Sequence, residues 1–422
     1  MSLTTRGRLD TDADADLLDT HLVDTYRRHL GAGRAAVGQF LGGIAEVASE
    51  GAWIEAADGR RFLDFGGYGV FLLGHRHPRV TAAVHRQLDR HPLASRTLLD
   101  PVTAAAAAAL AATTPADLDL VHFVNSGAEA TEAALKLARI QGRTSVITTT
   151  KGYHGKTLGA LSVTANATYQ DPFRPLLPGV TTVPYGDLDA MAAALSTTNG
   201  TGVVVLEPVQ GEGGVVIPPP GYLRGVAALC EAAGALLVVD EIQTGMGRLG
   251  TWWGIEAEDV VPDILLVGKG LSGGVVPIAA MVATPDAYAP FSKDPYLHTS
   301  TFAGSPLACA AAHAAIETMH DEQVVERAAL LGYQLLTGLR EICSRIRPPG
   351  LVEVRGRGLL LGVEFHDPGA VGELALQLVE RGVLSCHSLN SSRVLRFTPP
   401  AVLDADEVEH FVRTFEAALA TL

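Results

Sequence analysis

The sequence predicts an α/β protein with a large domain built on a mainly parallel, doubly wound sheet and a smaller α+β domain. Short runs rich in Val, Leu and Ile recur near residues 120, 145, 203, 236 and 264, with helical segments between several of them. The runs are apolar at consecutive positions, as expected of strands buried on both faces. From about residue 321 onward, helices alternate with shorter strands, which predicts the smaller domain.

The composition is typical of a folded, acidic enzyme. A chain of 422 residues is long enough for two cores, and 47% hydrophobic with 18% charged residues argues against disorder. The formal net charge of −14 argues against nucleic acid and membrane as partners. The four cysteines lack CxxC pairing, so we expect free thiols and no metal site. The absence of a targeting or membrane-spanning segment favours a cytoplasmic protein.

The first 65 residues are expected to form an N-terminal segment and part of the small domain. Residues 1–20 are interpreted as a flexible acidic lead, and a short helix is predicted over residues 22–30. Asp58-Gly59, between apolar residues, predicts a hairpin turn. The large domain is predicted over residues 66–315 and the C-terminal small domain over residues 316–422.

Strands and helices then alternate along the chain. We expect strands over residues 120–124, 145–149, 203–206, 236–239 and 264–267, and shorter strands over 359–365, 383–386 and 394–397. Helices are expected over residues 78–87, 104–112, 222–233 and 306–320, and from residue 127 to 139. The apolar residues Phe71, Leu72 and Leu73 fit either core packing or a pocket for an apolar chain.

Two strand ends carry the predicted chemistry. The strand over residues 236–239 is followed by Asp240, and the strand over residues 264–267 by Gly268-Lys269-Gly270. Ligands of open α/β sheets bind beyond the carboxyl ends of the strands, so the acid and the lysine are placed to meet one ligand. Glycine neighbours leave the lysine amine uncrowded, and it can approach a carbonyl group.

The segment Asn125-Ser126-Gly127-Ala128-Glu129 has two interpretations. A strand, a turn of small residues and a helix direct free backbone N–H groups at a phosphate. Ser126 and Glu129 also have the spacing of a capping box, which would satisfy those groups internally. For this segment alone the two interpretations are equally good. Together with Lys269, the phosphate site is favoured.

A lysine, an acid and a phosphate cradle match the requirements of pyridoxal phosphate. The cofactor aldehyde can take Lys269 as an imine, and ionised Asp240 can keep the pyridine nitrogen protonated, so that the ring accepts electrons from the carbon that loses its proton. The displaced Lys269 amine then acts as general acid and base. Tyr153 can cover one ring face, and Gln243 can bond the ring hydroxyl.

Six ordered segments carry a close resemblance to a known family. The sequence resembles the class III aminotransferases, which are fold type I pyridoxal-phosphate-dependent transferases and include ornithine, acetylornithine, 4-aminobutyrate and putrescine aminotransferases. The resemblance spans roughly residues 45–415. The segments are FVNSGAEATEAALKLAR (123–139), GYHGKTLGALS (152–162), LEPVQGEGGV (206–215), VVDEIQTGMGRLG (238–250), GKGLSGG (268–274) and HTSTFAGSPLACAAA (298–312).

The resemblance implies a role for each matching residue. Lys269 and Asp240 are the expected catalytic residues. Because the sites of the family lie at a homodimer interface, Thr301, with Ser300 near it, is expected to reach the phosphate of the neighbouring subunit. The implied cofactor-binding residues are Ser126, Gly127, Ala128, Tyr153, His154, Glu207, Asp240, Gln243, Lys269, Ser300 and Thr301.

Substrate recognition is expected at Tyr68, Lys156, Glu212 and Arg396. Arg396 matches the arginine that grips the substrate α-carboxylate. Glu212 matches a glutamate that pairs with this arginine when the bound amine has no α-carboxylate. Lys156 stands where relatives that act on 4-aminobutyrate or acetylornithine usually carry arginine. The putrescine aminotransferase branch has HGK at this point, and FRPLLPGV (173–180), IPPPGYL (217–223) and DPYLHTSTF (294–302) also look most like it.

The resemblance therefore implies an ω-aminotransferase that moves an amino group between a primary amine and a keto acid such as 2-oxoglutarate or pyruvate. The amine would be a diamine, or the terminal amine or aldehyde of a compound such as a natural-product intermediate. The alternative is an ornithine/acetylornithine-type or 4-aminobutyrate-type aminotransferase. The family also includes racemases and decarboxylases. A non-catalytic binding protein with this fold is disfavoured, because the lysine, acid and phosphate loop are intact.

Overall fold

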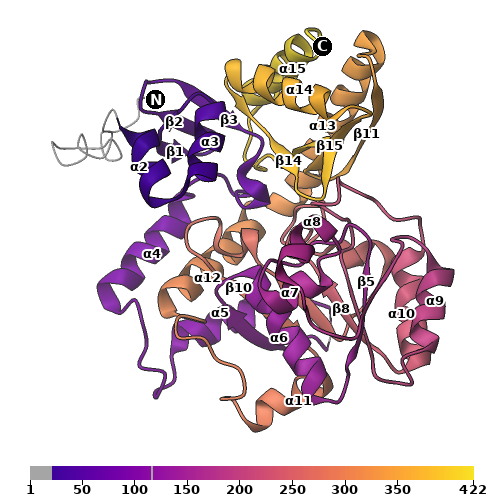
Figure 1. Ribbon diagram of the computed structural model, residues 1–422. Coiled ribbons are helices and arrows are strands. Elements are labelled where there is room, and N and C mark those ends of the chain that lie inside the picture. The colour runs from indigo at the N-terminus through magenta and orange to yellow at the C-terminus, as the bar shows by residue number, and fades with distance from the viewer. Residues whose placement is uncertain (1–20, 116) are drawn as a thin grey trace.

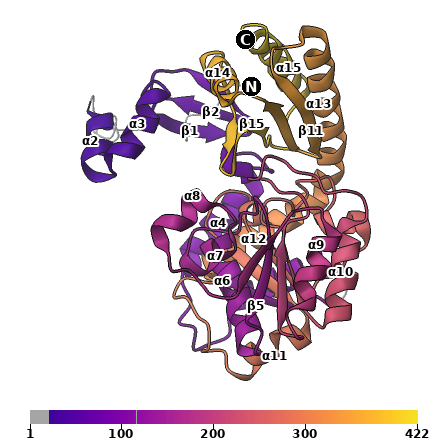
Figure 2. The same cartoon turned by 45° about the vertical axis from the view of Figure 1, so that its right-hand side comes forward.

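The computed structural model describes residues 21–115 and 117–422 and confirms the predicted α/β class (Figure 1). The segment 1–20, interpreted above as an acidic lead, lies outside the described residues. The chain forms a large unit around a seven-stranded sheet. A second unit above it combines the early strands with the C-terminal part of the chain (Figures 1 and 2).

The seven-stranded sheet has the strand order β4-β10-β9-β8-β7-β5-β6. Only β10 runs against its neighbours, because it pairs antiparallel with both β4 and β9, whereas the other pairs along the sheet are parallel. The five predicted strands are confirmed. The strands are β4 (Leu120–Val124), β5 (Ser145–Thr149), β6 (Val180–Val183), β7 (Gly202–Leu206), β8 (Leu236–Asp240), β9 (Ile264–Val267) and β10 (Ala279–Ala283).

Both faces of this sheet are covered by helices, which explains the continuous apolar runs. Leu237 and Val239 of β8 belong to a core shared with helices α5 (Pro101–Ala111), α9 (Leu188–Ser196), α10 (Tyr222–Ala233) and α12 (Pro306–Asp321). Val238 belongs to a core shared with α6 (Gly127–Ile140) and α11 (Pro285–Lys293). Figure 2 shows helices on either side of the strands. Since every side chain of β8 before Asp240 is apolar and buried, the first polar group appears at the carboxyl end of the strand.

The predicted helices are present, with shifted ends in some cases. The helix predicted from residue 104 begins at Pro101, because the Asp100 carboxylate accepts the Thr103 N–H at 2.7 Å and proline suits a first helical position. The helices up to residue 321 are α2 (Leu22–His29), α3 (Ala32–Phe40), α4 (Pro78–Arg90), α5 (Pro101–Ala111), α6 (Gly127–Ile140), α7 (Leu158–Val163), α8 (Ala167–Gln170), α9 (Leu188–Ser196), α10 (Tyr222–Ala233), α11 (Pro285–Lys293) and α12 (Pro306–Asp321).

The second unit contains two four-stranded sheets, with orders β1-β2-β3-β13 and β11-β12-β15-β14. The predicted hairpin at Asp58-Gly59 joins β2 and β3, and β13 pairs parallel with β3, which links the early strands to the C-terminal part. These strands are β1 (Glu46–Glu50), β2 (Trp53–Ala56), β3 (Arg61–Asp64), β11 (Leu351–Arg357), β12 (Leu360–Phe365), β13 (Val383–Leu384), β14 (Cys386–Ser388) and β15 (Ser391–Phe397), with helices α13 (Val324–Ile346), α14 (Pro368–Glu380) and α15 (Ala405–Leu419).

Several smaller expectations are also resolved by the fold. Leu72 and Leu73 are buried in the core and Phe71 stacks on His75, so core packing is the correct interpretation of this apolar segment. The four cysteines are free and buried. Among the described helices, none combines the length and apolar character needed to cross a bilayer.

Candidate active site

The predicted acid and lysine meet at one edge of the large sheet. β7, β8 and β9 are neighbours and run parallel, so Glu207 after β7, Asp240 at the end of β8 and Lys269 after β9 share the same edge. Lys269 has a φ of +43°, a left-handed backbone conformation that is uncommon for a residue with a Cβ. Such strained residues cluster at functional sites, where the surrounding structure maintains them.

Asp240 is held by His154. The carboxylate Oδ2 lies 2.7 Å from Nδ1 of the imidazole, and Oδ1 accepts the Ile242 N–H at 3.0 Å. Both side chains of the pair are buried. Burial alone would lower the pKa of His154, but the hydrogen bond to Asp240 and the charges of Asp240 and Glu207 outweigh it and raise the pKa. The hydrogen bond therefore fixes the orientation of the Asp240 carboxylate. The raised pKa favours the protonated form of His154 beside it.

Glu207 and Lys269 titrate away from their ordinary ranges. Glu207 accepts the Tyr153 N–H at 2.9 Å and the Gly211 N–H at 3.2 Å. Burial raises the pKa of Glu207 to about 7, against the opposing charge of His154. Burial also lowers the pKa of the Lys269 amine, although the charge of Glu212 opposes this. A lower pKa leaves more of the amine neutral, which is its nucleophilic form.

The capping and phosphate interpretations of residues 125–129 are compatible in the structure. Ser126 Oγ accepts the Glu129 N–H at 3.3 Å, while the Glu129 carboxylate accepts the N–H of Asn125 at 2.8 Å. The N–H groups of Gly127 and Ala128 belong to the first turn of α6, where no intrahelical acceptor exists. They can bind an anion. A Cβ on Gly127 would lie 2.6 Å from Ile242 Cδ1, so this close approach requires glycine.

Buried polar atoms without partners test whether the site fits a polar cofactor. Among the described residues, such atoms include His154 Nε2, both amide atoms of Gln243, and Nε and Nη1 of Arg396. An unsatisfied buried polar group costs about 1–3 kcal/mol, so these atoms indicate a polar ligand between them. With the free N–H groups of α6 and the amine of Lys269, the residues fit pyridoxal phosphate.

Glu212 and Arg396 form a buried ion pair between the two units. Arg396 Nη2 donates to Glu212 Oε1 at 2.7 Å, and the Leu389 N–H donates to Glu212 Oε2 at 2.9 Å. The arginine side chain is fully buried. Burial would raise the pKa of Glu212, but the charge and hydrogen bond of Arg396 outweigh it and lower the pKa. Glu212 is therefore held as a carboxylate against the arginine.

Tyr68 and Lys156 lie further out. Tyr68 is 55% exposed on the short helical turn η2 (Gly67–Gly69). Lys156 is exposed and its Nζ lies 3.8 Å from the centre of the Tyr169 ring. Burial raises the pKa of Tyr153, and the charges of Glu212 and Tyr169 add to this effect. The Tyr169 hydroxyl donates to the Leu389 carbonyl at 3.1 Å, so Tyr169 connects Lys156 to the backbone that bonds Glu212.

Ser300 and Thr301 are adjacent in the chain but have different surroundings. Ser300 Oγ accepts from Asn125 Nδ2 at 2.9 Å, next to the first turn of α6, and Arg96 donates to the Ser300 carbonyl. Thr301 is exposed. The single chain therefore brings Ser300 near the phosphate segment but leaves Thr301 at the surface.

The sequence did not reveal several residues that shape the site. Arg248 is buried and donates to the carbonyls of Gly69, Leu359 and Pro399 at 3.2, 3.1 and 2.6 Å, which ties the Tyr68 turn to the second unit. Burial lowers the pKa of this arginine to about 9. In the sequence, the only feature that could have indicated a role for Arg248 was its position shortly after Asp240, within residues 238–250. Tyr169, Leu389 and Asn390 carry no local pattern at all.

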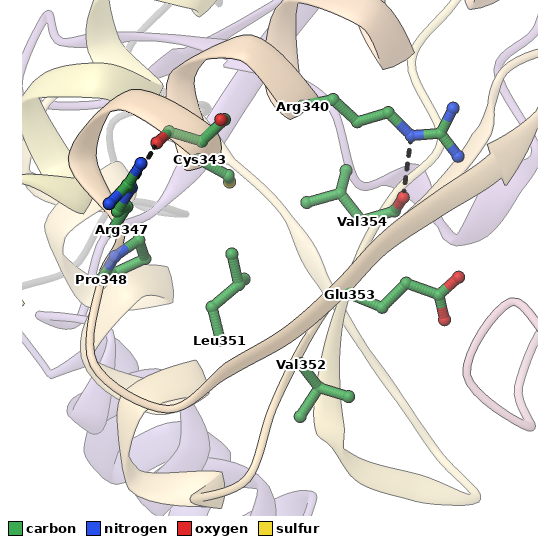
Figure 3. Close-up of a pocket in the computed structure, with 9 residues that line it drawn as sticks. Arg340, Cys343, Arg347, Pro348, Leu351, Val352, Glu353 and Val354 are labelled. Carbon is green, nitrogen blue, oxygen red and sulfur yellow. Dashed lines mark hydrogen bonds between the residues drawn. The ribbon is translucent and has the colours of Figure 1, made fainter.

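Figure 3 shows a surface depression elsewhere, between α13 and β11. Arg340 donates to the Val354 carbonyl and Arg347 to the Ser344 carbonyl, and the two guanidinium groups point away from each other. None of the predicted site residues lines it. We therefore assign the active site to the sheet edge and not to this depression.

Comparisons with known proteins agree with the geometry. Residues 36–419 match the family described as aminotransferase class-III. An ornithine aminotransferase from Toxoplasma gondii is 34% identical over 98% of this chain and 99% of its own, with a TM-score of 0.89. An (S)-enantioselective ω-transaminase from Thermomicrobium roseum is 29% identical over 95% and 98%, with a TM-score of 0.87. An acetylornithine aminotransferase from Elizabethkingia anophelis is 30% identical over 90% and 94%, with a TM-score of 0.78.

Proposed function

The chain belongs to the class-III aminotransferases, which are pyridoxal-phosphate-dependent enzymes, and we propose that it is an ω-aminotransferase. It would move an amino group between a primary amine, such as a diamine or a compound with a terminal amine, and a keto acid such as 2-oxoglutarate or pyruvate. A cytoplasmic location is part of the same proposal. The similarity to the putrescine aminotransferase branch, in particular Lys156 in HGK, supports an amine without a distal carboxylate.

One observation carries this proposal: the Arg396 guanidinium is neutralised by Glu212 at 2.7 Å. An amine without an α-carboxylate can bind while this pair stays intact, so no buried charge is left unpaired. A keto acid can take the place of Glu212 on Arg396 as a bidentate partner. The pair thus supports two substrates of different charge in one site.

The residues that would hold the cofactor combine unsatisfied polar groups with the acid at the end of β8. The N–H groups of Gly127 and Ala128 suit its phosphate, Asp240 its ring nitrogen and Gln243 its hydroxyl. When bound, pyridoxal phosphate supplies an aldehyde for the Lys269 amine and a protonated ring that accepts electrons. His154 keeps Asp240 oriented toward that ring.

The chain's own groups perform the proton transfer. Burial lowers the pKa of Lys269, so its amine can accept a proton from the substrate carbon and return it elsewhere. His154 Nδ1 holds the Asp240 carboxyl at 2.7 Å, and Glu207 fixes the backbone of Tyr153 through its N–H at 2.9 Å. The reaction class is therefore reversible transfer of an amino group with Lys269 as the acid–base group.

A homodimer with shared sites is a further part of the proposal. Leu98, Leu99, Tyr296 and Phe302 are 78%, 101%, 86% and 59% exposed, and Thr301 is an exposed neighbour of Phe302. Exposed apolar side chains of this size favour burial against another surface. A second copy of the chain would cover them and would bring Thr301 to the phosphate segment of its partner.

An ornithine-type enzyme is the second candidate. It is favoured by the similarity to two structures of ornithine aminotransferase from Toxoplasma gondii, at 36% and 34% identity. Lys156 also keeps a positive charge in the outer part of the site. Incubating the holoenzyme with putrescine, ornithine, 4-aminobutyrate and long-chain amines, with 2-oxoglutarate or pyruvate as acceptor, separates the candidates. Turnover restricted to the carboxylated amines would contradict the first proposal.

A further inference from the structure

The turn between β14 and β15 docks onto the large unit. Asn390 Nδ2 donates to the carbonyls of Lys151 and Gly152 at 3.0 and 3.1 Å, and Asn390 Oδ1 accepts from Asn166 at 2.9 Å. The Tyr169 hydroxyl donates to the Leu389 carbonyl at 3.1 Å. We call the residues Leu389 and Asn390 the hairpin tip. The hairpin tip belongs to the second unit, but the Asn390 side chain and the Leu389 carbonyl form hydrogen bonds with the large unit.

The hairpin tip also holds Glu212. The Leu389 N–H donates to Glu212 Oε2 at 2.9 Å, and the Asn390 N–H donates to the Glu212 carbonyl at 2.9 Å. Both oxygens of the Glu212 carboxylate therefore have partners: Arg396 on Oε1 and the tip on Oε2.

The backbone around Glu212 is fixed on both sides. Glu207 accepts the Gly211 N–H at 3.2 Å, and Arg355 donates to the Gly214 carbonyl at 2.6 Å. A Cβ on Gly214 would lie 2.9 Å from Val394, so the loop also packs closely on β15. Glu212 can leave Arg396 only by rotation of its side chain, and this rotation breaks the bond to the Leu389 N–H.

We propose that Asn390 and Tyr169 are positioning residues that, through the hairpin tip, set the preference of the site between carboxylate-free amines and carboxylate ligands. This inference rests on the proposed function. When a carboxylate ligand displaces Glu212, Glu212 loses its bonds to Arg396 and to the Leu389 N–H. The ligand forms a new bond to Arg396, but nothing replaces the bond between Leu389 and Glu212. A carboxylate-free amine leaves both bonds intact. The tip therefore opposes one class of ligand and is neutral toward the other.

The test uses two variants and one matched control. Asn390→Ala removes the side-chain anchors of the tip, and Tyr169→Phe removes only the hydroxyl while keeping the ring under Lys156. His387→Ala is the control, because His387 is an exposed residue of β14 in the same hairpin. Binding of the unreactive dicarboxylate glutarate to the holoenzymes is measured by calorimetry, alongside kcat and KM for putrescine and 2-oxoglutarate.

We expect both variants to bind glutarate about fivefold more tightly than the wild type, the effect of weakening one hydrogen bond. The KM for 2-oxoglutarate should fall by a similar factor, whereas kcat and the KM for putrescine should stay within about twofold. The control should match the wild type. Unchanged glutarate binding in both variants would overturn the inference, and so would an equal change for the amine and the carboxylate. If the wild type uses only carboxylated amines, the proposed function fails, but the glutarate comparison still tests the tip.

Discussion

Asp240 Oδ2 lies 2.7 Å from His154 Nδ1, and both side chains are almost completely excluded from solvent. Asp240 ends β8, while His154 follows β5, so the contact joins strands on either side of β7. A buried carboxylate without such a partner would be costly. The histidine therefore gives this buried acid a hydrogen-bond partner at the bottom of the site, where the ring nitrogen of the cofactor would bind.

Two substitutions in this pair should slow catalysis to different extents. Asp240→Asn removes the negative charge, and we expect kcat to fall about 10²–10³-fold, the range for loss of a preorganised electrostatic partner. His154→Ala leaves Asp240 with the Ile242 N–H, so a smaller loss of about tenfold is expected. Single-turnover kinetics with a saturating amine donor measure both. An effect of His154→Ala larger than that of Asp240→Asn would contradict the assignment.

Lys269→Ala should remove the acid–base group. We expect the rate of amino transfer to fall at least about 10⁴-fold, at the upper end for general acid–base catalysis, because Lys151, the lysine that follows β5 at the same edge, is exposed and cannot replace it. The yellow absorbance of the holoenzyme should also change, since the cofactor aldehyde loses its amine partner. Partial rescue of turnover by added methylamine would support a role in proton transfer. Retention of the wild-type spectrum and rate would refute it.

The strand ends could be predicted from the sequence, but the contacts between distant segments could not. Asp240 and Lys269 were found because strands buried on both faces leave a continuous apolar pattern. β10 was missed because Ala279–Ala283 is rich in alanine, which has little preference for strands. The hairpin tip was missed for a different reason: Leu389 meets Glu212 across 177 positions of the chain, and no local pattern encodes such a contact.

Gly69→Ala should disturb the cofactor site through Gln243. A Cβ at Gly69 would lie 2.2 Å from Gln243 Nε2, and the φ of +77° at this position disfavours any residue with a Cβ. We expect Gln243 to be displaced and the Kd for pyridoxal phosphate to rise about tenfold, near the upper end of the contribution of one hydrogen bond. Equilibrium dialysis of the apoprotein measures this. Gly59→Ala is the matched control, because the same kind of φ occurs there with open space around it.

The stability of the fold should depend on pH through Glu241. This buried carboxyl accepts from the Thr244 hydroxyl and from the Ile255 N–H at 2.9 Å, and burial raises its pKa from 4.5 to about 7. Between these values the folded chain binds more protons than the unfolded chain. The protonated Glu241 carboxyl therefore makes its full contribution to the free energy of unfolding below pH 4.5. This contribution is lost as the pH rises through about 7.

Glu241→Gln should remove this dependence, because the amide stays neutral. The difference amounts to about 2.5 kcal/mol between pH 5 and pH 8, because part of the effect of the pKa change lies below pH 5. Urea unfolding at several pH values, with wild type and variant under the same cofactor concentration, measures it. Glu207, whose pKa is also raised to about 7, stays in both proteins, so the variant should show a shallower pH profile and not a flat one. Parallel profiles would show that Glu241 does not titrate in this range.

Lys156→Ala should change which amines are used. The Lys156 ammonium lies 3.8 Å from the centre of the Tyr169 ring, where a cation–π contact holds it at the outer part of the site. An amine with a carboxylate at its far end would gain from this charge, whereas an amine without one would gain nothing from it. We therefore expect kcat/KM for 4-aminobutyrate to fall about tenfold in Lys156→Ala and kcat/KM for putrescine to stay unchanged. Lys151→Ala, at another exposed lysine of the same segment, should leave both values unchanged. Tyr169→Phe and Tyr169→Leu both lack the hydroxyl that bonds Leu389, so their comparison isolates the ring. Relative to Tyr169→Phe, Tyr169→Leu should lower kcat/KM for 4-aminobutyrate, because without the ring the ammonium is no longer held. Equal losses for both amines in Lys156→Ala would show that Lys156 serves only the fold.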